Sequence, residues 1–101
     1  MEELTDKTFS TIKKLDLVLV DFYTPTCSPC KTLHAELLHL ETLYSSVVFA
    51  RVNAESCKLA VSYGIMNVPT VILFKNGEII EQLLPRNTNA KGIAKLLERY
   101  S

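Results

Sequence analysis

The longest apolar segment of the chain, Leu17 to Tyr23, is apolar at both odd and even positions. This pattern predicts a central strand that is covered on both faces. Asp21 is the only charged residue inside the segment. Two further β-rich segments, Val47 to Asn53 and Thr70 to Lys75, predict two more strands.

Apolar residues at helical spacing predict two longer helices, one from about Pro29 to Tyr44 and one from about Asn89 to Arg99. Pro29 would lie in the first turn of the first helix, where a missing N–H is tolerated. The apolar residues at helical spacing in the first helix are Leu33, Leu37, Leu40 and Tyr44, and the second helix is expected to bury Ile93, Leu96 and Leu97.

Two short helices and a hairpin complete the pattern. Thr5 is expected to cap a helix from Asp6 to about Lys14. A second short helix is expected from about Ser56 to Ser62, with Gly64 as its stop. Asn76-Gly77 predicts a tight turn into a strand from Glu78 to Leu84.

The order of these elements predicts an α/β fold in a single domain, residues 1–101. A mixed sheet of four to five strands would be flanked by helices on both faces. The first two strong strands would be parallel, and the hairpin would make one edge antiparallel.

Charge and apolar run lengths exclude several function classes. Eleven basic and eleven acidic residues balance, and no basic block invites nucleic acid or anionic lipid. The longest apolar runs are four residues, whereas a membrane span needs roughly 20. No signal peptide is visible at the start. Three cysteines, an odd number, favour a reducing compartment, so we expect a cytoplasmic protein.

Cys27-Ser28-Pro29-Cys30 stands where the first strand passes into the first long helix. Two thiols at this spacing can close as a disulfide, and the start of a helix favours a thiolate. We therefore expect Cys27 to be the nucleophile of a reversible dithiol couple, with Cys30 less accessible. A passive disulfide or half of a metal site remains an alternative.

The sequence gives weaker functional evidence for the other candidate residues. His34 would bring a metal set to only three ligands, so we expect it to pack against the core. Cys57 is expected to be a partly buried thiol and His39 to face solvent.

Asp21, in an apolar strand, should be desolvated, which would raise its pKa and let it accept a proton near neutral pH. An aspartate at the exposed end of a strand is the alternative.

Five motifs, in order, resemble the thioredoxin family: Val20 to Tyr23, Cys27 to Lys31, Tyr63 to Ile65, Val68 to Thr70, and Leu73 to Glu78. The resemblance implies a thioredoxin fold and a protein-disulfide reductase. It also implies no bound cofactor beyond the redox-active disulfide Cys27-Cys30. The partners would be disulfide-containing proteins and a flavin-dependent thioredoxin reductase, and the protein would be a monomer.

The resemblance also implies roles for residues around the thiols. Asp21 would lie beneath the pair and accept the proton of Cys30, the resolving cysteine. Arg51 aligns with a lysine that neighbours this aspartate, although a surface arginine is equally compatible with the sequence. Pro69 would follow a cis peptide bond and expose the backbone of Val68 to an extended substrate.

Several positions are expected to contact substrate, and some depart from the family pattern. The chain has no tryptophan, Ala35 replaces a helix proline, and Pro85 replaces a glycine of the substrate groove. These departures leave the clients and the redox potential open. The substrate-contact candidates are Thr26, Ser28, Pro29, Lys31, Asn67, Val68, Thr70 and Pro85, with Met66 either beside them or in the core.

Other activities remain as alternatives. A disulfide oxidant or isomerase of an oxidising compartment would need a higher redox potential. Two alternatives belong to other functional classes. One is a thioredoxin-fold binding module without catalysis, and the other is a metal carrier built on the thiols. A glutathione-dependent activity is disfavoured, because the paired glycines that the glutaredoxin family uses near its last helix are absent.

Overall fold

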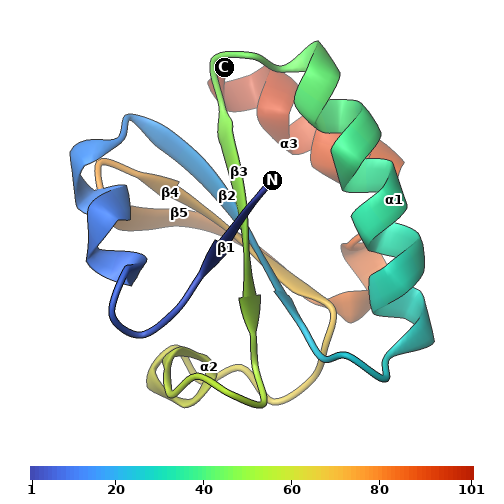
Figure 1. The fold of residues 1–101 in the computed structure, drawn as a ribbon. Coiled ribbons are helices and arrows are strands. Elements are labelled where there is room, and N and C mark those ends of the chain that lie inside the picture. Colours follow the sequence, from blue (N-terminus) through green and yellow to red (C-terminus); the bar gives the residue numbers. More distant parts are fainter.

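The computed structural model describes residues 1–101 and contains one five-stranded sheet in the order β1-β3-β2-β4-β5 (Figure 1). The strands are β1 (Glu2–Leu4), β2 (Leu17–Tyr23), β3 (Val48–Asn53), β4 (Thr70–Lys75) and β5 (Glu78–Leu83). The helices are η1 (Phe9–Lys14), α1 (Ser28–Leu43), α2 (Leu59–Ser62), η2 (Pro85–Asn87) and α3 (Ala90–Tyr100).

The sheet is mixed, as predicted. Strand β2 pairs in parallel with β3, which also pairs in parallel with β1. On its other side β2 pairs antiparallel with β4, and β4 pairs antiparallel with β5. The short β1 is the edge strand on one side and β5 is the edge strand on the other.

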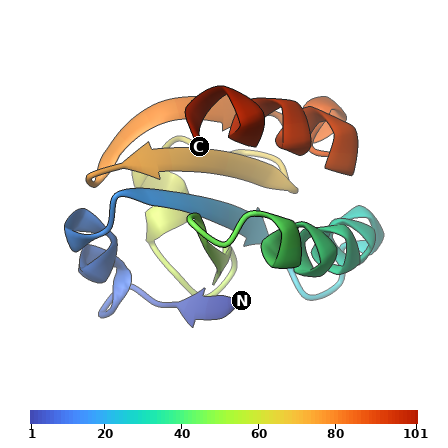
Figure 2. The same ribbon diagram turned by 90° about the horizontal axis from the view of Figure 1, so that it is seen from above.

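Helices cover both faces of the sheet. Helices α1 and α3 lie on one face, and η1 and α2 lie on the other (Figures 1 and 2). Two separate clusters of buried side chains fill the two interfaces. The predicted arrangement of layers is therefore confirmed.

Strand β2 contributes to both clusters because successive side chains of a strand point to opposite faces. Leu17 and Leu19 belong to the cluster under α1 and α3, and Val18, Val20 and Phe22 belong to the other. Asp21 follows Leu19 by two positions, so its side chain points to the face covered by α1 and α3.

The predicted helix from Asp6 to Lys14 is wrong in type and in length. The segment forms the 3-10 helix η1, which begins at Phe9 and has no side-chain cap. The hydroxyl of Thr8 accepts the backbone N–H of Thr5 at 2.9 Å. Such local side-chain bonds compete with regular helix, and tight i to i+3 bonds follow.

The predicted helix from Ser56 to Ser62 is also shorter than expected, because α2 spans only Leu59–Ser62. The side chain of Asn53 accepts the N–H of Glu55 at 2.9 Å, which forms a turn in place of a helical start. The carboxylate of Asp6 accepts the N–H of Lys58 at 3.0 and 3.1 Å. One neighbouring side chain and one that is distant in sequence thus bind the backbone N–H groups just before α2.

Both predicted glycine positions are confirmed. Asn76 and Gly77 have φ of 52° and 84°, the values of a type I′ hairpin turn. Gly64 has φ of 68° just after α2. Strand β5 ends at Leu83, one residue earlier than expected. No helix is both long enough and apolar enough to span a bilayer.

Candidate functional site

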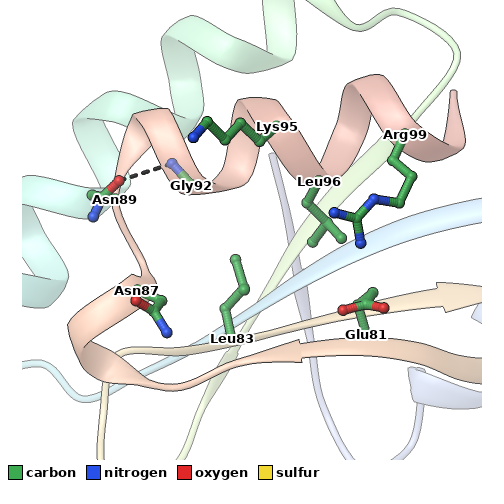
Figure 3. A pocket seen from close by; sticks show the side chains of 8 residues that line it. All are labelled: Glu81, Leu83, Asn87, Asn89, Gly92, Lys95, Leu96 and Arg99. Atoms are coloured by element: carbon green, nitrogen blue, oxygen red, sulfur yellow. Dashed lines mark hydrogen bonds between the residues drawn. The ribbon is translucent and has the colours of Figure 1, made fainter.

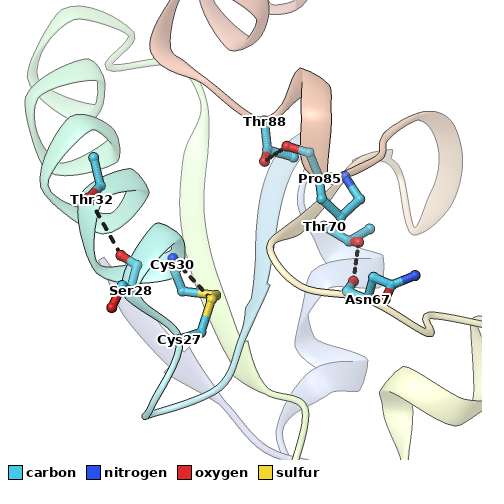
Figure 4. Close-up of a disulfide and its surroundings, with 8 residues drawn as sticks. All are labelled: Cys27, Ser28, Cys30, Thr32, Asn67, Thr70, Pro85 and Thr88. Atoms are coloured by element: carbon cyan, nitrogen blue, oxygen red, sulfur yellow. Dashed lines mark hydrogen bonds between the residues drawn. A yellow bond between two sulfur atoms is a disulfide. The ribbon is translucent and has the colours of Figure 1, made fainter.

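The two cysteines lie where β2 passes into α1, and a disulfide joins them (Figure 4). Their Cα atoms are 5.2 Å apart. Cys27 is the N-cap of α1, and its sulfur accepts the backbone N–H of Cys30 at 3.1 Å. Cys27 is half-buried and Cys30 is 1% exposed. The predicted difference in accessibility is confirmed.

The local backbone explains why Cys27 occupies the cap. Cys27 has an extended conformation (φ −85°, ψ 110°), and Pro29 stands in the first turn, where proline fits a helix. The carbonyl of Cys27 accepts the N–H of Lys31 at 3.2 Å, which starts the helix. The sulfur therefore lies among N–H groups that stabilise a negative charge.

The loop before β4 faces the disulfide. Phe22 near the end of β2 pairs with Thr70 at the start of β4, so this loop lies beside the cysteine turn. The Val68–Pro69 peptide bond is cis, as predicted. The hydroxyl of Thr70 donates to the carbonyl of Asn67 at 2.6 Å and closes the loop (Figure 4).

Pro85 opens η2 directly after β5 and lies on the same side of the disulfide as Asn67 and Thr70 (Figure 4). Together these three line a cleft of about 260 Å³. Met66 lines it too and is 90% exposed, which excludes the core position that the sequence left open for it. The remaining lining residues are Gly64, Ile65, Gln82 and Leu84.

The predicted substrate contacts form two groups around the disulfide. One group comes from the start of α1 and the turn before it, and its members are exposed: Thr26, Ser28, Pro29 and Lys31. The other group comes from the loop before β4 and from η2: Asn67, Val68, Thr70 and Pro85. Thr70 is almost fully buried, although it is one of the residues that line the cleft, and its hydroxyl supports the loop.

Asp21 is fully buried and neither carboxylate oxygen has a hydrogen-bond partner. Burial raises its pKa to about 7; the positive charge of Arg51 lowers it in part, and the negative charge of Glu3 raises it. The sequence-based expectation of a raised pKa is confirmed, and the alternative of an exposed strand end is wrong.

Arg51 lies directly across the strand pair from Asp21. Its guanidinium carbon is 3.5 Å from the centroid of the Tyr23 ring, a cation–π contact. The Tyr23 hydroxyl donates to both carboxylate oxygens of Glu3 at 2.9 Å. The expected neighbour of Asp21 is therefore confirmed, and a plain surface arginine is excluded.

Sequence reasoning missed Glu3 and Tyr23 as parts of this site. Glu3 pairs across the sheet with Arg51, which pairs in turn with Asp21. The three side chains therefore lie in one row on one face of the sheet. Only the strand order and register reveal the row, since these residues are far apart along the chain.

A second cleft, of about 230 Å³, lies behind the disulfide and is lined by Cys30, Tyr23, His34 and Arg51. His34 is half-buried, and its Nδ1 has no partner. Burial lowers its pKa, and the charge of Arg51 lowers it further. His34 thus lines this cleft and does not simply pack against the core. The cleft is also lined by Thr24, Pro25 and Lys31.

Other candidate positions lie outside the site. No three His, Cys, Asp or Glu side chains are grouped to hold a metal ion. Cys57 is half-buried against the second core cluster, and His39 is exposed, as expected. A hollow of about 260 Å³ between β5 and α3, with Glu81, Lys95 and Arg99 among its lining residues, contains no cysteine (Figure 3).

The comparisons with known proteins agree with this geometry. The family model described as thioredoxin matches residues 1–99. The chain is 36% identical to a thioredoxin of Chlorobaculum thiosulfatiphilum, covering 90% of this chain and 91% of that one. It is 29% identical to a thioredoxin of Acetoanaerobium sticklandii, covering 99% of both. The structure of Plasmodium falciparum thioredoxin superposes with a TM-score of 0.92 at 28% identity, covering 100% of both chains.

Proposed function

Because this chain belongs to the thioredoxin family, we propose that Cys27 is the nucleophile and Cys30 the resolving cysteine of its disulfide reduction. The protein is a thiol–disulfide oxidoreductase that reduces disulfides in proteins. The observation that carries the assignment of roles is the position of the Cys27 sulfur. It caps α1 and is half-exposed, whereas Cys30 is buried one turn later.

The first step is attack of the Cys27 thiolate on one sulfur of a client disulfide. A bond forms between the Cys27 sulfur and the client, and the client S–S bond breaks. The second client sulfur leaves as a thiolate and takes up a proton. The N–H groups at the start of α1 stabilise the attacking thiolate.

The second step is attack of Cys30 on Cys27 of the mixed disulfide. Asp21 accepts the thiol proton of Cys30, since a carboxylate with a pKa of about 7 can take a proton at neutral pH. The Cys27–Cys30 bond forms, the mixed disulfide breaks, and the client leaves with its second thiol. Two electrons have passed from the protein dithiol to the client. A cleft lined by Cys30 and by Arg51, the strand partner of Asp21, lies beside this pair.

Client recognition uses the loop before β4 in this proposal. Val68 lies in this loop and offers its backbone to an extended client segment. Thr26, Ser28, Pro29 and Lys31 receive the client on the other side of the disulfide, and Asn67 and Pro85 line the far wall.

The remaining parts of the proposal concern the setting. Residues 1–101 act as a single domain and as a monomer, without a bound cofactor other than the redox disulfide. A flavin-dependent thioredoxin reductase returns the disulfide to the dithiol, so the protein takes part in electron transport in the cytoplasm. The family membership and the odd number of cysteines support this setting.

The equilibrium potential of the Cys27–Cys30 couple against glutathione tests the proposal. A reductant of this family should have a value near about −270 mV, whereas a disulfide oxidant lies near about −120 mV. A value at the oxidising end would assign the protein to the disulfide oxidants instead. If the cysteine couple does not exchange with glutathione at all, the protein would instead be a binding module without catalysis.

A further inference from the structure

The guanidinium of Arg51 does not pair with the carboxylate that stands opposite it. Arg51 and Asp21 are direct partners across β3 and β2. Yet both oxygens of Asp21 and the Nε of Arg51 are buried without a hydrogen-bond partner, and no ion pair within 4.0 Å joins the two residues. A buried carboxylate next to an arginine normally forms such a pair, so something must hold the guanidinium away.

Tyr23 and Glu3 supply the contacts that hold it. Tyr23 follows Asp21 by two positions and points to the same face of the sheet. Its ring lies 3.5 Å from the guanidinium carbon of Arg51, and its hydroxyl is bound to both oxygens of Glu3. Glu3 also stands directly across from Arg51 on the side away from Asp21.

We propose that Tyr23 and Glu3 are positioning residues that hold the Arg51 guanidinium off Asp21, so that the carboxylate remains free to accept the proton of Cys30. The proposal rests on the role of Asp21 proposed above. Neither Tyr23 nor Glu3 touches the reacting sulfurs in this scheme. Tyr23 acts through Arg51, whereas Glu3 acts through Arg51 and also through its own negative charge, which raises the pKa of Asp21.

The electrostatic reason follows from what a direct pair would do. A bidentate ion pair with Arg51 would favour the ionised carboxylate and lower its pKa. Asp21 would then be a weak proton acceptor at neutral pH. With the guanidinium stacked on Tyr23, burial remains the larger influence, and the pKa of Asp21 stays at about 7.

The other groups around Asp21 do not replace the effect of the Arg51 position on its pKa. On β4 its direct neighbour is Val71, which is apolar. From α1, Cys30, Lys31 and His34 line the adjoining cleft. Burial lowers the pKa of His34, which favours the neutral imidazole. Tyr23 keeps its donated proton, since its pKa is raised to about 12 by burial and by Glu3.

The test is the pKa of Asp21, followed by NMR of its labelled carboxyl carbon in the oxidised full-length protein. Tyr23→Leu removes the stacking surface, and we expect the pKa of Asp21 to fall by about one pH unit as Arg51 moves to it. An unchanged or raised pKa in this variant would overturn the proposal.

Water entering the space left by the ring could also lower this pKa, and a double variant separates the two causes. In an Arg51→Gln background there is no guanidinium to move, so Tyr23→Leu should then leave the pKa of Asp21 unchanged. A fall of equal size in both backgrounds would overturn the proposal, because the effect would not pass through Arg51.

Matched variants test the two contacts separately. Glu3→Gln should lower the pKa of Asp21 more in the original protein than in the Arg51→Gln background, where only the direct effect of the Glu3 charge is lost. Glu2→Gln, the same change on the neighbouring exposed residue, should not lower it in either background. Equal falls for Glu3→Gln in the two backgrounds would overturn the role of Glu3 in holding Arg51. Tyr23→Phe keeps the ring and should leave this pKa close to its original value. A fall in Tyr23→Phe as large as in Tyr23→Leu would overturn the role of the stack.

The pH profile of mixed-disulfide release connects the positioning to the reaction. Its midpoint should move to lower pH in Tyr23→Leu together with the carboxyl resonance. If Asp21→Asn leaves this profile unchanged, the proposed role of Asp21 fails. The NMR result on Tyr23 and Arg51 would still decide whether the guanidinium is held off.

Discussion

The backbone N–H of Cys30 donates to the sulfur of Cys27 at 3.1 Å, which links the two cysteines beyond their disulfide. The same N–H would stabilise a thiolate on Cys27 after reduction. Cys30 is buried and Cys27 is half-exposed. This relationship supports the proposed order of the two exchange steps, with Cys27 attacking the client first.

Replacing each cysteine should give different defects. Cys27→Ser should lower the reduction of insulin disulfides to the uncatalysed background, because no nucleophile remains. Cys30→Ser should accumulate mixed disulfides, visible by mass spectrometry as covalent adducts. Cys57→Ser is the matched control and should keep full activity, since Cys57 packs against the other core cluster. Full turnover by Cys27→Ser would contradict the assignment.

Asp21→Asn should stabilise the oxidised protein above neutral pH. The folded-state pKa of Asp21, about 7, lies above its unfolded value of 3.8. The folded state therefore binds the proton more tightly, and stability falls as pH rises from about 4 through about 7. The full penalty on the ionised form is about 4 kcal/mol.

Urea denaturation at pH 5 and at pH 9 measures this difference. The gain from Asp21→Asn should be largest at pH 9 and should shrink toward pH 5. The control is Asp16→Asn, whose side chain is exposed and which should change stability little at either pH. A gain that does not depend on pH would contradict the buried-carboxylate account.

The same Asp21→Asn variant should slow the release of mixed disulfides by about 100-fold at pH 7. An amide cannot accept the Cys30 proton, so Cys30 must ionise without help. Stopped-flow measurement of client release would record the rate. Formation of the mixed disulfide should be less affected, because Cys27 is already stabilised by α1. Equal slowing of both steps would argue for a general disturbance of the site.

Gly77→Ala should destabilise the fold by about 1–2 kcal/mol for left-handed strain alone, and by more because of a steric clash. An added Cβ would meet Lys13 at 2.9 Å from its Cγ and 3.0 Å from its Cα. Gly64→Ala is the matched control, since its φ is also positive but nothing lies within 4 Å. Thermal denaturation should show a larger loss of stability for Gly77→Ala than for Gly64→Ala. Equal losses of stability would show that the clash with Lys13 contributes nothing.

Pro85→Gly should change how the protein discriminates among clients. Pro85 lines the cleft beside the loop before β4, so glycine would open that wall. We expect kcat/KM for insulin to change by up to about tenfold, with little change for a small disulfide such as dithionitrobenzoate. Arg86→Gly, at the next and exposed position outside the cleft, is the control. Parallel changes for both substrates would indicate an effect on the dithiol itself.

Local pattern was enough to predict much of the fold. The apolar run of β2, the leucine spacing of α1 and Asn76-Gly77 each identified an element. Local pattern failed for η1 and α2, where side chains of Thr8, Asn53 and Asp6 take the backbone groups that a helix needs. The bond between Asp6 and Lys58 depends on which segments meet in space. The bonds of Thr8 and Asn53 are local turns that compete with a helix.

The sequence by itself determined the dithiol and its place at the start of a helix, because thiol spacing and the strand-to-helix boundary are local properties. It also marked Asp21 as the polar exception in a buried strand. Only the tertiary structure decided what surrounds that carboxylate. Glu3, Arg51 and Asp21 come from three strands, and their row exists only through the order and register of β1, β3 and β2. Pairing register is set by the packing of the whole sheet, and no single segment carries it.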